Sequence, residues 1–585
     1  MLTREQALTQ LTGPGGSFQL TTDPSDRPGA LRVYATGPKT LREVLIASRA
    51  FDDREFLIYE GERLTYKAHY HRVAQLGAWL VSQGVGHGDR VGICKRNYPD
   101  WSIAFFACQA IGAVAVTLNA WWTGDELVYG ISDSGCSVAV LDDERYGRLL
   151  PVLNQLPVSN EPRALHQPRA LHQPRALDQP RALQVLVVRD HDRVYDVTHW
   201  EDALAAHSDV QDLPAATVDP LDTATIMYTS GTTGFPKGAL HTHRNHTTNI
   251  QNTLLAGAVA RAQLPDSTEV APPVPSALQT FPLFHIGGLS GLYISLTSGG
   301  KLVLMYRWDV EEALALIQRE QIMSWSAVPT LVRQMLEHPA ATDAALSTVV
   351  GIASGGAPVP ADLINQIGAQ FRSRVAPGNG YGATETTSAI IVNGGADYLA
   401  RPQSVGRPVV TVDVRVVDEQ GHDCGAGGIG ELWARGPNIF AGYWNRPEET
   451  DAAFSEGWFR TGDLGYMDDQ GFYYVVDRKK DVIIRGGENV YCAEVEGVLH
   501  EHPQIVDVAL IGLPHRIFGE EVAAVVETAP GAVLSEAEVQ ACVATRLARY
   551  NVPTQVFFTD EALPRTASGK ILKRELKERY AAANS

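Results

Sequence analysis

Short apolar runs alternate with longer helical stretches through the first two thirds of the chain. Runs without polar alternation are typical of strands that are buried on both faces of a sheet. The clearest runs are residues 91–94, 137–141, 301–305 and 349–353. Because strands that alternate with helices usually pair in parallel, the pattern predicts an α/β fold with layered subdomains.

The pattern changes at about residue 404. Residues 404–491 consist of short apolar segments separated by tight turns, such as residues 468–471, and predict a β-rich, barrel-like subdomain of antiparallel strands. Residues 481–585 again mix a strand, residues 508–511, with a helix near residues 536–550. Since 585 residues exceed one core of ordinary size, we expect a large α/β domain and a small α+β domain at the carboxyl end.

The longest uncharged stretch, residues 101–118, does not predict a membrane span. It contains Gln109, and at Gly112 its character changes from helical to strand-like. A transmembrane helix needs about 20 apolar residues in one regular element, so a buried helix, turn and strand are favoured. The amino end lacks the pattern of a secretory signal, and the six cysteines form no C-x-x-C pair. We therefore expect a cytoplasmic protein with reduced thiols and no integral membrane span.

Residues 163–182 repeat the hexapeptide Arg-Ala-Leu-His-Gln-Pro, with aspartate in place of histidine in the third copy. A period of six matches neither a helix face nor a strand, and a proline in each unit prevents a continuous helix. We interpret this segment as a low-complexity surface insertion without chemistry.

The chain is acidic, with a formal net charge of -18. A negative protein repels the phosphate backbone of a nucleic acid, so we expect no nucleic-acid partner. Features that bind anions must therefore be local.

Residues 229–238 place hydroxyls, glycines and a lysine in one short loop after an apolar strand, residues 224–228. Glycines let the backbone approach an anion, hydroxyls donate hydrogen bonds, and a lysine adds a point charge. The segment lacks the Walker A order G-x-x-x-x-G-K-[ST], because no hydroxyl residue follows its lysine. It still predicts a phosphate-binding loop at the carboxyl end of a strand, formed by Thr229, Ser230, Gly231, Thr232, Thr233, Gly234 and Lys237.

Later segments carry the residue types that complete an ATP site. They supply a histidine in an apolar turn, bare backbone for a flat ring, an aromatic face, a hydroxyl, carboxylates for a metal and for ribose hydroxyls, and cations. In chain order the residues are His285, Gly355, Gly356, Ala357, Tyr381, Gly382, Thr384, Glu385, Asp463, Arg478 and Lys570. Each residue alone has a plain structural explanation, such as a turn cap or core packing, so the prediction depends on their joint order.

As a set, these segments closely resemble the acyl-CoA synthetase family of the adenylate-forming enzymes, which also include nonribosomal peptide adenylation domains and beetle luciferases. The resemblance extends from about residue 64 to Lys570, apart from the repeat. Its motifs stand at residues 229–238, 381–385, 457–465, 477–481 and 564–570. It implies a large amino-terminal domain, residues 1–479, and a small mobile domain, residues 480–585.

The resemblance also implies a two-step reaction with ATP, Mg²⁺ and coenzyme A. A carboxylic acid substrate would first form an acyl-adenylate with release of pyrophosphate, and the thiol of coenzyme A would then displace AMP. Lys570 would bridge the attacking carboxylate and the α-phosphate, Thr384 would contact phosphate, and Glu385 would hold Mg²⁺.

The remaining site residues also receive roles from the resemblance. Asp463 and Arg478 would hold the ribose, and His285 would help to orient the thiol or the acyl group. The small domain would rotate about Lys480 between the two steps. The adenine would be framed by Gly355, Gly356, Ala357 and Tyr381.

The sequence leaves the identity of the acid open. A medium- or long-chain fatty acid is our first expectation, and an aryl or alicyclic carboxylate is the second. An acyl-AMP ligase that loads a carrier protein would share every motif, and a luciferase-like monooxygenase would share the adenylation set. Peripheral membrane contact, and either a monomer or a homodimer, are compatible with the sequence.

Overall fold

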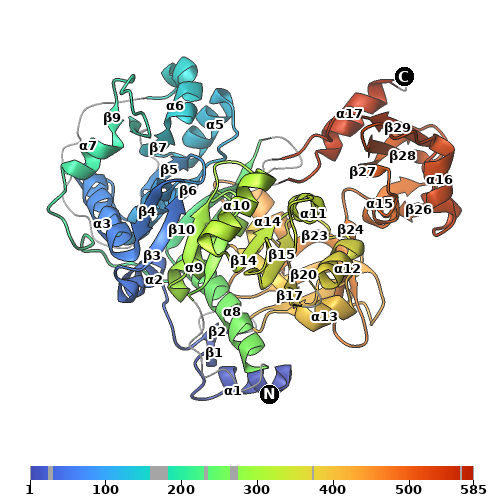
Figure 1. Ribbon diagram of the computed structural model, residues 1–585, viewed down its shortest axis with the longest axis horizontal. Helices are drawn as coiled ribbons and strands as arrows, with labels where there is room; N and C mark the ends of the chain where they lie inside the picture. Colours follow the sequence, from blue (N-terminus) through green and yellow to red (C-terminus); the bar gives the residue numbers. More distant parts are fainter. Residues whose placement is uncertain are drawn as a thin grey trace.

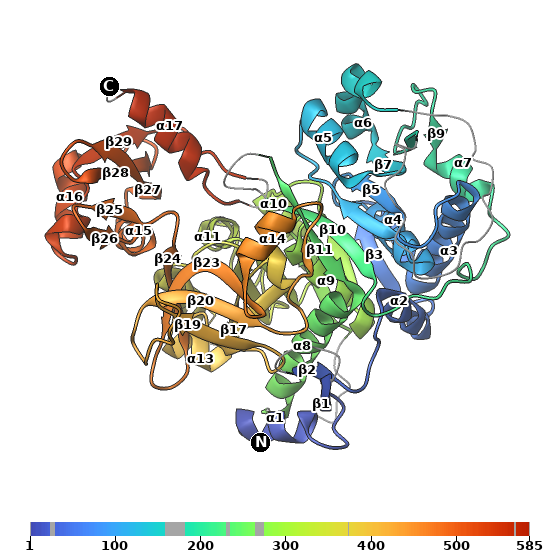
Figure 2. The same ribbon diagram turned by 180° about the vertical axis from the view of Figure 1, so that it is seen from behind.

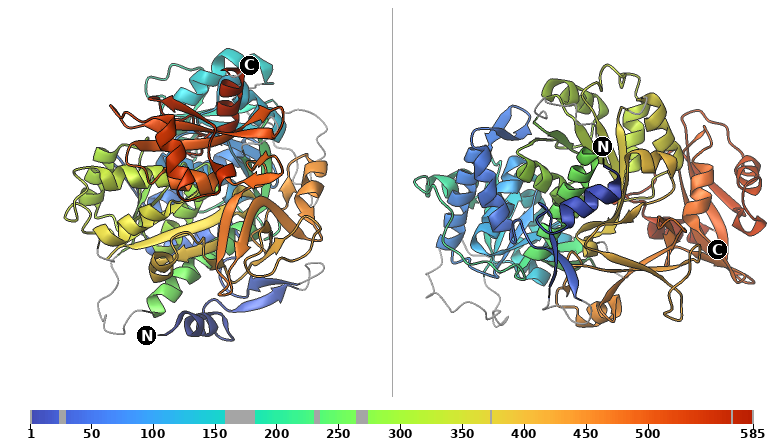
Figure 3. Two further views of the ribbon diagram at one scale, coloured as in Figure 1. Left: turned by 90° about the vertical axis from the view of Figure 1, so that its right-hand side faces the viewer. Right: turned by 90° about the horizontal axis from the view of Figure 1, so that it is seen from below.

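The computed structural model describes residues 2–23, 30–157, 182–229, 235–263, 274–371, 374–566 and 569–583. A large body holds most of the chain, and a smaller carboxyl-terminal unit lies beside it, drawn in red at the upper right of Figure 1. The same separation is visible from behind in Figure 2 and from below in the right-hand view of Figure 3. The predicted large and small parts are therefore present, whereas a boundary at Lys480 stays a prediction.

One sheet of the large body has eight strands among the described residues. Its order is β21 (Gly442–Tyr443), β11 (Lys237–Thr242), β10 (Thr223–Thr229), β6 (Val114–Thr117), β5 (Arg90–Cys94), β7 (Val138–Asp142), β8 (Gln184–Val188) and β9 (Thr198–His199). The pairs from β10 to β9 are parallel, and the two pairs made by β11 are antiparallel. The strands predicted at residues 91–94 and 137–141 are confirmed as β5 and β7, which are almost wholly buried.

The second sheet has nine strands in the described chain. Its order is β18 (Arg407–Pro408), β17 (Ser388–Gly394), β16 (Ala376–Ala383), β15 (Gly351–Gly355), β14 (Ser324–Ala327), β12 (Ser276–Gln279), β13 (Lys301–Leu304), β3 (Glu55–Tyr59) and β4 (Glu62–Thr65). The pairs from β16 to β3 are parallel. This confirms the predicted pairing and the strand at residues 301–305, while the strand predicted at residues 349–353 begins two residues later, at Gly351.

Helix α4 (Pro99–Ile111) is buried along its whole length and shares one core with residues of both sheets. Pro99 opens the helix, where its missing N–H costs no hydrogen bond, and Gly112 ends it in the left-handed conformation at φ 73°. β6 follows at Val114, which confirms the predicted helix, turn and strand. None of the helices in the described parts of the chain is long and apolar enough to cross a membrane.

Other helices of the large body cover the sheets or join their strands. They are α1 (Arg4–Thr12), α2 (Leu41–Ser48), α3 (Tyr66–Ser82), α5 (Gly124–Ser134), α6 (Asp143–Leu149), α7 (Trp200–Ala205), α8 (His243–Ala262), α9 (Ile286–Ser298), α10 (Val310–Glu320), α11 (Pro329–Glu337), α12 (Ala361–Gln370), α13 (Gly395–Ala400) and α14 (Pro447–Ala453). The predicted insertion lies outside the described residues, apart from Ala182.

The predicted antiparallel region is confirmed. Its sheet contains β19 (Asp413–Val417), β20 (Gly430–Arg435), β22 (Phe454–Ser455), β23 (Trp458–Met467) and β24 (Tyr473–Arg478), and all its pairs are antiparallel. In the turn between β23 and β24, Asp468 accepts hydrogen bonds from the N–H groups of Gln470 and Phe472, and Gly471 has φ 78°. Local turn chemistry therefore places β24 beside β23.

The carboxyl-terminal unit has its own sheet and buried core. The unit contains β25 (Ile483–Arg485), β26 (Glu488–Val490), β27 (Ile505–His515), β28 (Gly519–Thr528), β29 (Gln555–Thr559), α15 (Cys492–Leu499), α16 (Glu536–Ala544) and α17 (Lys573–Ala583). The predicted strand at residues 508–511 lies within β27. The helix predicted to residue 550 ends at Ala544, because Leu547 and Tyr550 turn back to pack against this core.

Candidate active site

The predicted site residues lie where strands of the two sheets end. Thr229 ends β10, Gly355 ends β15, and Thr384 directly follows β16. His285 lies beyond β12 and occupies the position before α9, where its side chain makes no capping hydrogen bond. The carboxyl ends of parallel strands are where open α/β sheets bind ligands, so the fold places these residues at the expected edge.

The predicted phosphate loop connects β10 to β11. Thr229 and Lys237 pair directly across this hairpin. The Lys237 ammonium lies 5.2 Å from the centre of the Tyr443 ring, and the Tyr443 hydroxyl donates to Glu385 Oε1 at 2.9 Å. Tyr443 therefore joins the loop to the predicted metal ligand, a role that no sequence pattern indicated. The other predicted loop residues lie outside the described residues, namely Ser230, Gly231, Thr232, Thr233 and Gly234.

A tight turn presents Thr384 and Glu385. These residues form a short 3-10 helix, Thr384–Thr386, and the next two residues, Thr387 and Ser388, have positive φ values of 48° and 84°. Such values are costly for residues with a Cβ, and they persist only where neighbouring contacts hold the backbone.

Two hydrogen bonds from residues 438–440 and one glycine hold this turn in place. The Glu385 carbonyl accepts from the Phe440 N–H at 2.8 Å, and the Thr386 carbonyl accepts from Asn438 Nδ2 at 3.0 Å. A Cβ on Gly382 would lie 2.0 Å from the Ser388 carbonyl oxygen, so only glycine fits at this close approach.

Asp463 and Arg478 are direct partners in the β23–β24 ladder, with their charged groups 3.6 Å apart. The Tyr381 hydroxyl donates to Asp463 Oδ2 at 2.7 Å. Burial raises the pKa of Asp463, while Arg478, the Tyr381 hydroxyl and Lys570 oppose that shift. The structure thus brings together the predicted ribose and adenine residues Asp463, Arg478 and Tyr381. Gly355 ends the neighbouring strand β15, and a Cβ on it would lie 3.2 Å from the Gly380 carbonyl oxygen. Gly356, at φ 79°, and Ala357 follow this strand.

Lys570 reaches this site from the carboxyl-terminal unit. The segment before α17 extends back to the large body in Figures 1 and 2, and a Cβ on Gly569 would lie 3.0 Å from Val328. Burial and the positive charge of Arg478 lower the pKa of Lys570 to about 8, against the influence of Asp463 and Glu385. The ammonium therefore lies among the residues that sequence reasoning assigned to ATP.

His285 is half-buried and close enough to Lys570 for that charge to act on its ring. Burial and the Lys570 charge lower its pKa to about 4, so the imidazole is neutral near pH 7. Within the described chain, its buried Nε2 has no hydrogen-bond partner. A buried polar atom without a partner is costly, and a ligand in the site would supply one.

The residues present fit a nucleotide with Mg²⁺. Lys570, Lys480 and Arg478 act on one another as like charges around Asp463, so an anionic ligand would relieve their repulsion. Glu385 offers a carboxylate, and Mg²⁺ is commonly held by one or two carboxylates together with substrate phosphates. No group of three or more histidine, cysteine, aspartate or glutamate side chains that could hold a metal ion occurs among the described residues.

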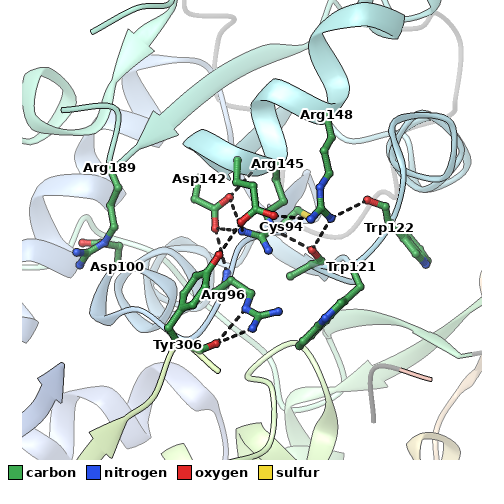
Figure 4. Close-up of polar contacts among 12 residues, drawn as sticks. Cys94, Arg96, Asp100, Trp121, Trp122, Asp142, Arg145, Arg148, Arg189 and Tyr306 are labelled. Carbon is green, nitrogen blue, oxygen red and sulfur yellow. Dashed lines mark hydrogen bonds and ion pairs between the residues drawn. The ribbon is translucent and has the colours of Figure 1, made fainter. Parts of the chain in front are cut away.

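A cavity of about 350 Å³ opens beside Gly569 and was not indicated by the sequence. Its wall includes Gly569, Phe281, Trp121, Tyr306 and Arg96. Figure 4 shows the Arg96 guanidinium between Trp121 and Tyr306, at 4.1 and 4.6 Å from their ring centres, and bonded to the Tyr306 carbonyl. These contacts come from three distant segments, so no local pattern reveals them.

Comparison with known proteins identifies the family. Residues 46–444 match the AMP-binding enzyme family, and residues 494–570 match the AMP-binding enzyme C-terminal domain. The chain belongs to the AMP-binding enzymes, and within the adenylate-forming superfamily it is an AMP-forming acyl-CoA synthetase.

Relatives cover nearly the whole chain. A feruloyl-CoA synthase of Amycolatopsis is 36% identical over 521 residues, which are 89% of this chain and 94% of that protein. A long-chain-fatty-acid–CoA ligase of Bacillus subtilis is 32% identical over 545 residues, which are 92% of this chain and 94% of the relative. The chain is also similar to a solved structure of o-succinylbenzoate coenzyme A synthetase from Bacillus subtilis, in complex with ATP and magnesium ion. The TM-score is 0.73 and the identity 28%, and the match covers 91% of this chain and 99% of that one.

Proposed function

We propose that this protein activates a carboxylic acid as an acyl-adenylate, with release of pyrophosphate, and then transfers the acyl group to coenzyme A. One observation carries the first step: the small unit meets the large body at Gly569, beside Val328, and there the half-buried ammonium of Lys570 feels the charges of Asp463 and Glu385. A site assembled from two parts of the chain suits a reaction that needs positive charge at a defined point.

The proposed chemistry is electrostatic. A carboxylic acid with a pKa of about 4–5 is ionised at neutral pH, so attack on the α-phosphorus needs no general base. The barrier comes from bringing one anion to a polyanion. Lys570 and the loop lysine Lys237 would offset this repulsion, and Mg²⁺ held by Glu385 would supply further charge neutralisation. Asp463 and Arg478 would fix the ribose and so the position of the α-phosphate.

An exposed apolar surface supports a rearrangement between the two steps. Ile484, Ile517 and Phe518 are exposed on the small unit, next to the turn at Gly486 and Gly487. Exposed apolar residues that cluster beside a turn are typical of a docking face. Rotation about Lys480 would turn this face toward the large body and withdraw Lys570.

The cavity beside Gly569 supports coenzyme A as acceptor. It opens next to the reacting region and has aromatic and guanidinium groups on its wall, which suit a narrow polar arm. A thiol with a pKa of about 8.5 is partly ionised at pH 7, so the second step does not depend on a strong base. The neutral His285 could orient the thiol or the acyl carbonyl.

Two substrate classes follow from the relatives. A medium- or long-chain fatty acid is the first candidate, in keeping with the relative from Bacillus subtilis. An aryl acid is the second, favoured by the more similar feruloyl-CoA synthase and by polar side chains between α8 and α9, where Asn249 donates to Ser290 at 3.1 Å.

A panel of carboxylic acids tests the proposal. Pyrophosphate release should depend on one class of acid, and coenzyme A should be consumed in equal amount to AMP formed. Pyrophosphate release without coenzyme A consumption would point instead to an acyl-AMP ligase that loads a carrier protein. No pyrophosphate release with fatty, aryl or alicyclic acids would contradict the proposal.

A further inference from the structure

A buried hydrogen-bonded chain lies directly behind the Thr384–Glu385 turn. Its four members come from four different elements: His241 on β11, Thr225 on β10, His246 on α8 and Tyr293 on α9. Each of the four is shielded completely from solvent. No step of the proposed reaction uses them directly.

The contacts form one continuous line. His241 Nε2 lies 2.7 Å from the Thr384 carbonyl oxygen. Thr225 Oγ1 lies 3.2 Å from His241 Nδ1 and 3.0 Å from His246 Nε2. The Tyr293 hydroxyl lies 3.2 Å from His246 Nδ1. The line thus runs from α9 through α8 and two strands to the backbone of the turn.

The carbonyl at one end sets the direction of every bond. It can only accept, so His241 carries its proton on Nε2, and its Nδ1 must accept from the Thr225 hydroxyl. Thr225 then has only its oxygen left to accept from His246 Nε2–H. His246 Nδ1 therefore accepts from the Tyr293 hydroxyl. With neutral rings, a single arrangement of protons satisfies the whole line.

Burial keeps the two histidines and the tyrosine of this line in their uncharged protonation states. It lowers the pKa of His241 to about 4 and that of His246 well below its usual value, and it raises the pKa of the Tyr293 hydroxyl. Both imidazoles are therefore neutral, and the phenol keeps its proton, near neutral pH.

The turn in front needs such an anchor. Its residues Thr387 and Ser388 hold costly positive φ values, and the carbonyls of Glu385 and Thr386 are already fixed by hydrogen bonds. The Thr384 carbonyl accepts from the Thr387 N–H at 2.9 Å within the turn, and His241 adds a second hydrogen bond to it from outside the turn. Because a trans peptide is planar, this bond also fixes the Glu385 N–H, which points away from the buried line.

We propose that His241, Thr225, His246 and Tyr293 form a positioning relay that sets the Thr384–Glu385 peptide for Mg²⁺-bound ATP. The inference rests on the proposed function, because it assumes that this turn contacts the metal and the phosphates. The four residues touch neither and act through the Thr384 carbonyl.

Nucleotide binding tests the relay without knowledge of the acid. The affinity for ATP, with no acid present, is measured by titration calorimetry with Mg²⁺ and with EDTA. The gain in affinity from Mg²⁺ is a ratio within one protein, so the fraction of folded protein does not affect it. Thr225→Val keeps the side-chain shape and breaks the line at its centre. It should reduce the Mg²⁺ gain by about tenfold, the loss expected for one buried hydrogen bond.

Three further variants separate positioning from stability. Thr225→Ser keeps the hydroxyl and should retain the gain. Tyr293→Phe removes only the last donor and should reduce the gain by less than Thr225→Val. Thr117→Val removes a buried hydroxyl on the neighbouring strand β6, which has no hydrogen-bond partner among the described residues, and should leave the gain unchanged.

The outcomes distinguish a failure of the relay from a failure of the proposed function. If the wild type gains affinity with Mg²⁺ and Thr225→Val retains that gain within about twofold, the relay is overturned while the proposed function stands. A fall of the same size in Thr117→Val would also overturn it, because any buried hydroxyl would then serve. If the wild type binds no ATP under either condition, the proposed function fails together with the relay.

Discussion

At the scale of single residues, the site combines burial with an excess of positive charge. Lys570, Lys480 and Arg478 all act on the half-buried carboxylate of Asp463, and each lysine has a lowered pKa because burial disfavours its ammonium. An anionic substrate would reverse this cost, so the charge distribution of the free protein already favours a phosphate ester.

Replacing the lysine tests its role in the first step. Lys570→Gln keeps a polar side chain of similar length and removes the charge, so pyrophosphate release should fall by about 10²–10³-fold, the usual loss for one transition-state contact. Thioester formation from a supplied acyl-adenylate should change little. Lys577→Gln on α17 is a matched control, since that lysine pairs with Glu520 at the surface. Equal losses in both half-reactions would contradict the role.

The same lysine predicts a pH dependence. Its pKa is lowered to about 8, so the ammonium is present below that pH and is lost as pH rises through it. For adenylation, kcat/KM with ATP should therefore fall by about tenfold per pH unit above pH 8, and kcat should fall only at higher pH, because bound phosphates stabilise the ammonium. Pyrophosphate release measured from pH 6 to 10 gives the pH profiles of both kcat/KM and kcat. A profile that stays flat to pH 10 in kcat/KM would contradict the assignment, and Lys570→Gln should lack the descending limb.

At the scale of elements, local patterns predicted most of the fold. Buried strands such as β5 and the turn at residues 468–471 follow from apolar runs and turn chemistry within a few neighbouring residues. Site residues could be predicted only where the chemically active side chains lie together in one short sequence motif. Arg96 between Trp121 and Tyr306, and the relay behind Thr384, could not be predicted, because their partners come from distant elements and leave no period in the chain.

The end of β16 illustrates how one element presents the site. Gly382→Ala would place a Cβ 2.0 Å from the Ser388 carbonyl, so the turn that holds Glu385 must shift. We expect the free energy of unfolding to fall by about 2–4 kcal/mol, and the affinity for ATP with Mg²⁺ to fall as well. Chemical denaturation and calorimetry measure the two effects. Gly378→Ala on the same strand is the control, since its Cβ would meet Ala353 at an ordinary 3.4 Å. Equal behaviour of the two variants would show that the close approach is unimportant.

At the scale of the whole molecule, the two parts touch where Gly569 lies against Val328 and where the Cys492 N–H of α15 donates to Asp477 of β24, while the apolar residues Ile484, Ile517 and Phe518 of the small unit remain exposed. An arrangement that leaves such residues in water is suited to one step of a cycle. The other step would bury them, and the link near Lys480 lies between β24 and β25, where the change would occur.

A proline in this link tests the rotation. Lys480→Pro removes no backbone hydrogen bond found among the described residues, since none is donated by the Lys480 N–H, but it restricts rotation at residues 479 and 480. Adenylate formation should be kept, because Lys570 already lies in the site. Thioester formation should fall by about tenfold or more, a barrier increase of about 1.4 kcal/mol. Lys480→Ala removes the side-chain charge while leaving rotation free, so it separates an electrostatic effect from a hinge effect. Pyrophosphate release and thioester formation from acyl-adenylate are measured in separate assays. If the proline variant loses both steps equally, or behaves as the alanine variant does, the hinge lies elsewhere.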